Sequence, residues 1–220
     1  MEFYEAIYGR RSIRAYRPEP VPKELIEKIL HAAIWAPSNS NVQPWEFIVL
    51  AGRAKQGLDE FLDGLLKVAT RADYDPSLPE AGFALPGEFR DRRNRLISEM
   101  VGFVKAQGGD VGKLSRGSFS FFNAPCAIVA AMDRGHGLGV MVSVAAAIQN
   151  LLLAAFAEGL GTCWLAMPLI YGNRIREHLG LPESKRLVAG IALGYPADSP
   201  VNRFRSSREP LEKVVAWRLE

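Results

Sequence analysis

Residues 137–157 read GLGVMVSVAAAIQNLLLAAFA, a run of 21 residues without a charged side chain. Its length meets the criterion for a helix that crosses a membrane. The run is nevertheless rich in Ala and Gly, and it carries Ser143, Gln149 and Asn150 in its body. No second span accompanies it, and aromatic anchors do not stand at both of its ends. These features favour a central helix that its own protein buries on all sides.

The segments around this helix mix helical and strand patterns without a regular βαβ rhythm. Apolar spacing and breaker residues predict helices within 22–36, 53–69, 88–106, 140–157 and 170–180. Runs of β-branched and aromatic residues predict strands at 43–50, 126–132, 162–167, 187–196 and 213–217. One helix is too apolar for a surface layer, so the pattern favours an α+β sandwich in which helices cover one sheet.

Composition narrows the class of protein. The 220 residues include 27 Lys or Arg and 24 Asp or Glu, which gives a formal charge of +3. So mild a charge does not indicate a nucleic-acid partner. The two cysteines and three histidines have no metal-ligand spacing, so no metal site is expected. The N-terminus lacks the apolar core of a secretory signal. We therefore expect a soluble cytoplasmic protein with no membrane partner.

The common nucleotide-binding motifs and the serine nucleophile motif are missing from the sequence. The sequence has no GxGxxG turn after a strand, no GxxxxGK[ST] phosphate loop and no GxSxG elbow. The nearest candidate, GHGLG at 135–139, lacks the third glycine at the required spacing. If the chain is an enzyme, a cofactor must supply the reactive group.

Three segments carry the residues suited to hold such a cofactor. GRRSIRAY gathers Arg10, Arg11, Ser12 and Arg14, whose guanidinium forks match phosphate oxygens. PSNSNVQPW at 37–45 is rich in amides stiffened by prolines, and NRFRSSREPLEKVV carries further arginines. Each segment alone has a simpler reading as a solvated turn. The basic run RDRRNR at 90–95 is interpreted as a solvated helix face.

Taken in order, GRRSIRAY, APSNSNVQPWEF, GLGTCWLAMPL, ALGYP and SREPLEKVV resemble the nitroreductase family of FMN-dependent flavoproteins. The resemblance covers nearly the whole chain, with 71–118 the least recognisable part. The ending PVNRFRSSREPL is similar to the nitrobenzoate-reductase branch. It implies one FMN-binding domain over 1–220, an α-β-α sandwich with a mostly antiparallel central sheet, and an intertwined homodimer. Residues 71–118 would form a helical excursion near the active site.

The resemblance also implies which residues form the site. The two FMN sites of the dimer would lie at the subunit interface. The implied cofactor-binding residues are Arg10, Arg11, Ser12, Arg14, Ser38, Asn39, Asn41, Leu165, Ala166, Met167 and Arg208. Of these, Ser38, Asn39 and Asn41 would come from the partner subunit, and 165–167 would lie beside the isoalloxazine ring. The segment WLAM offers mainly backbone groups to that ring.

The implied activity is reduction of small-molecule acceptors, nitroaromatics or quinones, by NADH or NADPH. Hydride would pass through flavin N5 in a ping-pong sequence, with no catalytic side chain. A carboxylate on the acceptor would need a positive partner, for which Arg203, Arg205 or an arginine of 90–95 are the candidates. Three alternatives stay open: a reductive dehalogenase or flavin-modifying relative, a non-catalytic FMN-binding module, and a protein that binds a polyanion without flavin.

Overall fold

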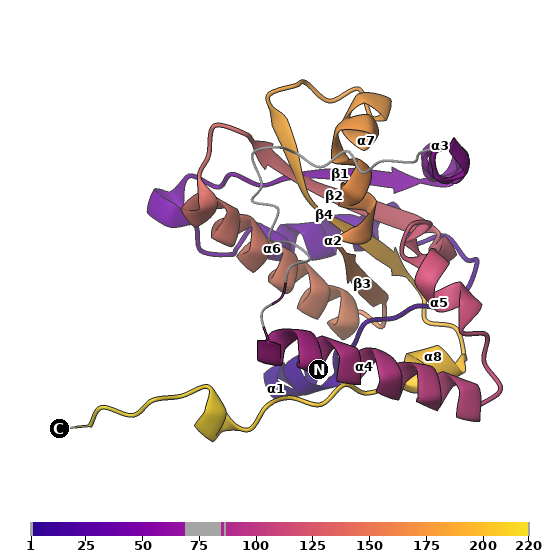
Figure 1. Ribbon diagram of the computed structural model, residues 1–220. Coiled ribbons are helices and arrows are strands. Elements are labelled where there is room, and N and C mark those ends of the chain that lie inside the picture. Colours follow the sequence, from indigo (N-terminus) through magenta and orange to yellow (C-terminus); the bar gives the residue numbers. More distant parts are fainter. Residues whose placement is uncertain (1, 69–84, 86, 220) are drawn as a thin grey trace.

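The computed structural model describes residues 2–68, 85 and 87–219; for 113, 115, 138, 167 and 168 it describes the backbone alone. Its centre is an antiparallel sheet with the strand order β1-β2-β4-β3 (Figure 1). The strands are β1 (Glu46–Ala51), β2 (Cys126–Asp133), β3 (Gly161–Leu165) and β4 (Lys185–Gly194). The helices are α1 (Phe3–Gly9), α2 (Lys23–Ala33), α3 (Gly52–Val68), α4 (Gly87–Ala106), α5 (Gly112–Gly117), α6 (Leu138–Ala157), α7 (Gly172–His178) and α8 (Pro200–Arg203).

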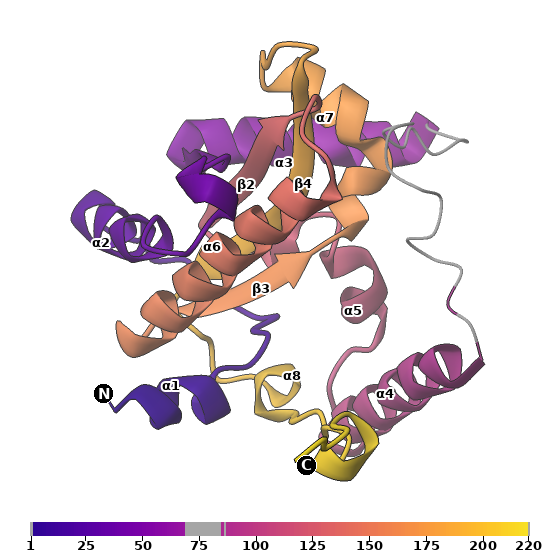
Figure 2. The same ribbon diagram turned by 90° about the vertical axis from the view of Figure 1, so that its left-hand side faces the viewer.

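Helices cover both faces of the sheet (Figure 2). Strand β2 lies in the middle, and its side chains alternate between two apolar cores. Ile128 and Ala130 pack with α2 and α6, whereas Val129 and Ala131 pack with α3 and α7. Because both faces of β2 are covered, the strand is apolar from Cys126 to Met132 rather than alternating. This confirms the predicted α+β sandwich.

The predicted helices within 22–36, 53–69, 88–106, 140–157 and 170–180 correspond to α2, α3, α4, α6 and α7. The short helices α1, α5 and α8 were not predicted, because four to seven residues contain too few turns for an apolar period to be visible. The predicted excursion at 71–118 contains α4 and α5, while 69–84 and 86 lie outside the described residues.

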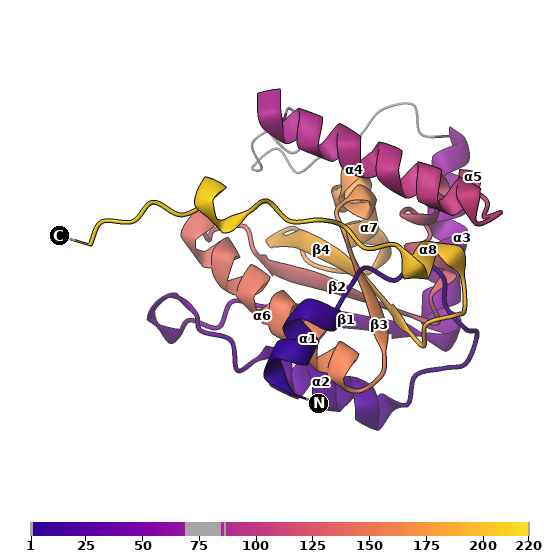
Figure 3. The same cartoon turned by 90° about the horizontal axis from the view of Figure 1, so that it is seen from below.

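The predicted strand at 213–217 is wrong. The segment begins with a 3-10 turn at Leu211–Lys213 and continues without regular structure. It extends away from the body of the molecule (Figures 1 and 3). Val214 and Trp217 are about two-thirds exposed, at 65% and 67%. A strand needs a neighbouring edge for its backbone hydrogen bonds, and this segment has none within the described part of its own chain.

The prediction that the chain buries 137–157 on all sides is also wrong. One face of α6 packs against the sheet and α2 through buried residues that include Val144, Ile148 and Leu151. On another face, Val142 is 67% exposed. The helix is long and apolar enough to cross a membrane by length and composition, but it packs on the sheet as core helices of soluble proteins do. The described part of the chain leaves this second face of α6 partly open.

Helices α1, α4 and α8 form a separate group below the sandwich (Figure 1). The ring of Phe103 on α4 lies 5.7 Å from that of Phe204, which follows α8. On the other side, α1 packs against the end of α6, where the ring of Phe156 would contact any side chain at Gly9 at 2.6 Å. The segment between α1 and α2 then passes along β3 at the edge of the sheet.

Candidate functional site: a pocket lined by five arginines

Arginines from two distant parts of the chain meet in one pocket of about 290 Å³. Arg10, Arg11 and Arg14 come from the segment after α1, and Arg205 and Arg208 from the segment after α8. The other lining residues are Ile7, Tyr8, Ser12, Leu96, Met100, Phe204 and Ser206. Among the described residues, no carboxylate lines this arginine pocket. Five cations without an acidic counterpart form a site for an anion.

The edge of the sheet holds the first arginine segment in place. The Ile13 N–H donates to the carbonyl of Thr162 at 2.9 Å, and Ser12 forms a parallel bridge with the same residue of β3. The approach is close, because a Cβ at Gly161 would lie only 2.7 Å from Ile13. Glycine is therefore required at 161, and the arginines on both sides of Ile13 are fixed relative to the sheet.

Asn202 on α8 connects the two arginine segments. Its Oδ1 accepts the N–H groups of Arg14 at 2.8 Å and Ala15 at 3.2 Å. Its Nδ2 donates to the carbonyls of Ala15 at 2.7 Å and Ala197 at 2.9 Å. The side chain is buried, and all four bonds join it to backbone. Because Arg205 and Arg208 follow three and six residues later, Asn202 sets the position of one arginine segment relative to the other.

Replacing Asn202 by alanine should therefore destabilise the protein. Four hydrogen bonds at about 1 kcal/mol each, with buried backbone groups left unpaired, predict a loss of about 4 kcal/mol. Urea unfolding followed by circular dichroism measures the change. Asn150→Ala is the matched control, since Asn150 makes a single 3.5 Å bond, to Ala32 O, and should cost less than about 1 kcal/mol. Equal losses in the two variants would contradict the connecting role of Asn202.

The electrostatics of the arginine pocket also indicate an anion. Burial, reinforced by repulsion from Arg208, lowers the pKa of Arg10. Burial and the charge of Arg205 lower the pKa of Arg11 in the same way. The buried Nε of Arg11 has no hydrogen-bond partner among the described residues. An anionic ligand among these guanidiniums would offset their mutual repulsion, and its oxygen atoms would offer acceptors for their unpaired N–H groups.

The remaining arginines of the pocket are oriented by carbonyls and hydroxyls. Arg205 Nη1 donates to Gly9 O at 2.8 Å, and Arg208 Nη1 donates to Ser207 O and Ser206 Oγ, both at 2.9 Å. Neutral acceptors orient a guanidinium without neutralising it. The donor set therefore has no acidic partner in the pocket and fits a phosphate.

The predicted amide loop lies at the other end of α6. The Asn39 N–H donates to Ser143 Oγ at 3.2 Å, near the start of the helix. The arginine segment packs at Phe156, thirteen residues further on, which is about 20 Å along a helix axis. Ser38, Asn39 and Asn41 therefore do not join the arginine pocket of their own chain. Within this loop Asn41 has a φ of 56°, a conformation that asparagine tolerates well.

The predicted ring-contact residues follow the end of β3. Leu165 pairs with Gly190 and its side chain is buried in the core beneath α3 and α7, so only its backbone is available to a ligand. Ala166 is exposed, and the side chain of Met167 lies outside the described atoms.

Neither cysteine nor metal chemistry is evident in the described residues. Burial raises the pKa of Cys163, which lies beside Ser12, and that of Cys126 to about 12. Thiols with raised pKa values are poor nucleophiles. No group of three His, Cys, Asp or Glu side chains gathers in metal-binding geometry within 2–68, 85 and 87–219.

Arg203 and Arg205 lie in different surroundings, although both were expected as partners for an acceptor carboxylate. Arg203 points away to an exposed ion pair with Asp198 at 2.6 Å, whereas Arg205, expected only as a partner for an acceptor carboxylate, lines the arginine pocket. Asn202, Leu96 and Met100 were not predicted as site residues. Asn202 stands directly before Arg203 at the start of an arginine-rich segment, which was a weak signal for it; no local pattern marks the other two.

The sequence matches the profile of the Nitroreductase family over residues 7–195. This chain belongs to the nitroreductase family. A 4-nitrobenzoate reductase of Nocardioides sp. (strain LMS-CY) is 34% identical over 99% of this chain and 90% of its own length.

Two solved nitroreductase structures share this fold. The FMN- and NADPH-dependent nitroreductase NfnB of sphigopyxis sp. strain HMH has a TM-score of 0.90 at 26% identity, with 99% of each chain covered. The FMN-dependent nitroreductase NfnB of Mycobacterium smegmatis, solved with NADPH, has a TM-score of 0.86 at 30% identity, covering 98% of this chain and 97% of that one.

Proposed function

We propose that this protein is an FMN-dependent oxidoreductase that uses NAD(P)H to reduce nitroaromatic or quinone-type acceptors. The observation that carries the proposal is the arginine pocket, which gathers five unneutralised cations in a nitroreductase-family fold. The relatives named 4-nitrobenzoate reductase and FMN- and NADPH-dependent nitroreductase support it. Residues 1–220 would form a single FMN-binding domain, and the enzyme would act in the cytoplasm.

The residues of the arginine pocket fit the cofactor. Arg10 and Arg208 would hold the FMN phosphate, joined by Arg205, because these guanidiniums lack acidic partners in the pocket. Arg11, Ser12 and Arg14 would contact the ribityl chain and the pyrimidine edge. When bound, FMN supplies two-electron exchange between NAD(P)H and the acceptor. A guanidinium at the pyrimidine edge would stabilise negative charge there.

The exposed face of α6 supports a homodimer. An apolar helix face left partly open, with Val142 67% exposed, is suited to a second copy of the chain. Because the amide loop and the arginine segment lie at opposite ends of α6, two antiparallel copies of this helix would bring each loop to the other chain's arginine pocket. Ser38, Asn39 and Asn41 of the partner subunit would then complete the site.

Proton delivery would not need a catalytic side chain. In the described pocket, the lining residues that carry dissociable protons are arginines, Tyr8 and two serines. Arginine stays protonated in proteins and does not act as an acid. Protons for the reduced acceptor would come from water, and the backbone groups after β3 would orient the flavin ring.

A two-stage absorbance experiment tests the proposal. The purified protein should be yellow, and it should release FMN on denaturation. Anaerobic NADH or NADPH should then bleach it, and addition of 4-nitrobenzoate should restore the colour. A colourless protein that gains no flavin would support the polyanion alternative. A yellow protein that no reductant bleaches would be a non-catalytic FMN module, and reoxidation by an iodophenol alone would indicate a dehalogenase.

Steady-state kinetics should give parallel double-reciprocal lines when NAD(P)H and 4-nitrobenzoate are varied together. One pocket would serve donor and acceptor in turn, because the sequence carries no separate Rossmann motif. NADH and NADPH series with nitrobenzoate, nitrobenzene and a quinone provide the measurement. Intersecting lines would contradict the ping-pong sequence without contradicting the cofactor assignment.

A further inference from the structure

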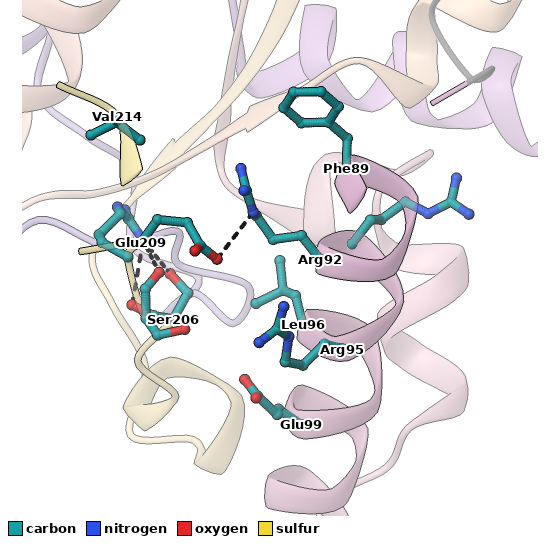
Figure 4. Close-up of a pocket in the computed structure, with 11 residues that line it drawn as sticks. Phe89, Arg92, Arg95, Leu96, Glu99, Ser206, Glu209 and Val214 are labelled. Carbon is teal, nitrogen blue, oxygen red and sulfur yellow. Dashed lines mark hydrogen bonds and ion pairs between the residues drawn. The ribbon is translucent and has the colours of Figure 1, made fainter. Parts of the chain in front are cut away.

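A second hollow, of about 560 Å³, lies between α4 and the segment after α8. We call it the α4 groove. Figure 4 shows Arg92, Arg95 and Leu96 projecting from α4 toward the segment that carries Ser206 and Glu209. Its lining residues are Phe89, Arg92, Arg93, Arg95, Leu96, Glu99, Ser206, Ser207, Arg208, Glu209 and Val214. The run 90–95 is a largely exposed helix face, as expected, and three of its arginines also line this groove.

Some charged side chains of this groove are paired with each other, and others are not. Glu209 accepts Lys213 Nζ at 3.0 Å and Arg92 Nε at 3.1 Å, and these two cations, with the more distant charge of Arg95, lower its pKa. Arg92 is therefore already paired with Glu209 and is not the first candidate to bind a ligand. Arg95 makes no hydrogen bond or ion pair with the described residues, and Glu99 lines the groove beside it without an ion pair to it (Figure 4). Four arginines against two glutamates leave the groove positive, with Arg95 available to a ligand.

The groove adjoins the arginine pocket. Leu96, Ser206 and Arg208 line both, so a ligand in one lies directly beside a ligand in the other. If Arg208 holds the FMN phosphate, as proposed above, the groove opens at the phosphate end of the cofactor rather than at its ring. A ligand that reaches the ring and also fills the groove must therefore be long.

Length discriminates between the two anionic substrates. A nitrobenzoate holds its nitro group and its carboxylate on one benzene ring, so it cannot place one at the flavin ring and the other beyond the flavin phosphate. NADPH separates its nicotinamide from its 2′-phosphate by two riboses and a pyrophosphate. A groove of about 560 Å³ lies within the usual size of small-molecule sites and has room for an adenosine moiety.

We propose that the α4 groove binds the adenosine 2′-phosphate of NADPH and that Arg95 is its direct partner. This inference rests on the proposed function. It predicts that the enzyme prefers NADPH to NADH, and that the preference resides in Arg95 on α4, outside the arginine pocket.

The test compares Arg95→Ala with Arg90→Ala in the FMN-loaded protein. Arg90 lies on the same helix, has a side chain 60% exposed, and does not line the groove. Loss of a charge-assisted hydrogen bond should lower kcat/KM for NADPH about tenfold in R95A. The kcat/KM of R95A for NADH should stay within about twofold of the wild-type value. R90A should match the wild type with both NADPH and NADH. By calorimetry, R95A should bind 2′,5′-ADP about tenfold more weakly and 5′-AMP unchanged.

Several results would overturn the inference. Equal use of NADH and NADPH by the wild type, or equal losses with both in R95A, would exclude recognition of the 2′-phosphate at Arg95. A raised KM for 4-nitrobenzoate but not for nitrobenzene, with NADPH unaffected, would assign the groove to the acceptor's carboxylate instead. Arg95→Glu, which places a negative charge at this exposed position, should abolish the preference for NADPH over NADH. A wild type without flavin would instead refute the proposed function itself.

Discussion

A single carboxylate on the open face of α6, introduced as Val142→Glu, is expected to convert a flavin-loaded dimer into a flavin-poor monomer. Val142 is 67% exposed in the single chain, so the substitution should leave the fold of the monomer intact. In the proposed dimer two copies would carry unpaired charges into the apolar contact, at a cost of several kcal/mol. The dissociation constant of the dimer should rise by about a hundredfold or more. Sedimentation and flavin absorbance measure both effects.

Leu66→Glu is the control for this experiment. Leu66 is 40% exposed on α3, which covers the opposite face of the sheet. The same charge there should leave both the dimer and its flavin content unchanged. A V142E protein that stays dimeric with full flavin would exclude α6 from the interface. A monomer that keeps its flavin would show that the site is complete within one chain, and would contradict the contribution of the partner's amide loop.

Loss of one arginine from the arginine pocket is expected to weaken FMN binding by about 2 kcal/mol, or roughly thirtyfold. Arg10→Ala and Arg208→Ala are the informative variants, because the positive charges of these two side chains repel each other and would share the phosphate. Titration of apoprotein with FMN, followed by fluorescence quenching, gives the affinity. Riboflavin, which lacks the phosphate, should bind the variants and the wild type with similar affinities.

Arg203→Ala is the matched control, since Arg203 lies in the same segment but pairs with Asp198 at the surface. Its affinity for FMN should equal that of the wild type. Unchanged FMN affinity in both R10A and R208A would show that the phosphate lies elsewhere. Equal weakening of FMN and riboflavin would show instead that the arginines act on the fold rather than on the phosphate.

Much of this architecture is determined locally by the sequence. The apolar run from Cys126 to Met132 predicts a strand, and the structure forms β2 there. The dense donors Arg10 and Arg14 are chemically suited to an anion, and together with the amide loop and the C-terminal arginines they predict a cofactor site. The motif order of the nitroreductase family extends that prediction to FMN. None of these predictions needs knowledge of how distant segments meet.

The C-terminal part of the chain shows the limit of such reasoning. The pattern of KVVAW at 213–217 is that of a strand, but a strand forms only where another edge accepts its hydrogen bonds, and the described chain offers none there. Likewise the composition of α6 predicts burial but not what buries it. The single chain covers one face and leaves Val142 open.

Tertiary structure alone decided which arginines act together. Arg203 and Arg205 are two residues apart and equivalent in the sequence, yet one pairs with Asp198 at the surface and the other lines the arginine pocket beside Arg11. The difference arises because Asn202 ties α8 to the backbone at Ala15, which fixes the direction in which the following residues leave the helix. Residue type sets the charge available to a site, whereas contacts between segments far apart in the chain set where that charge points.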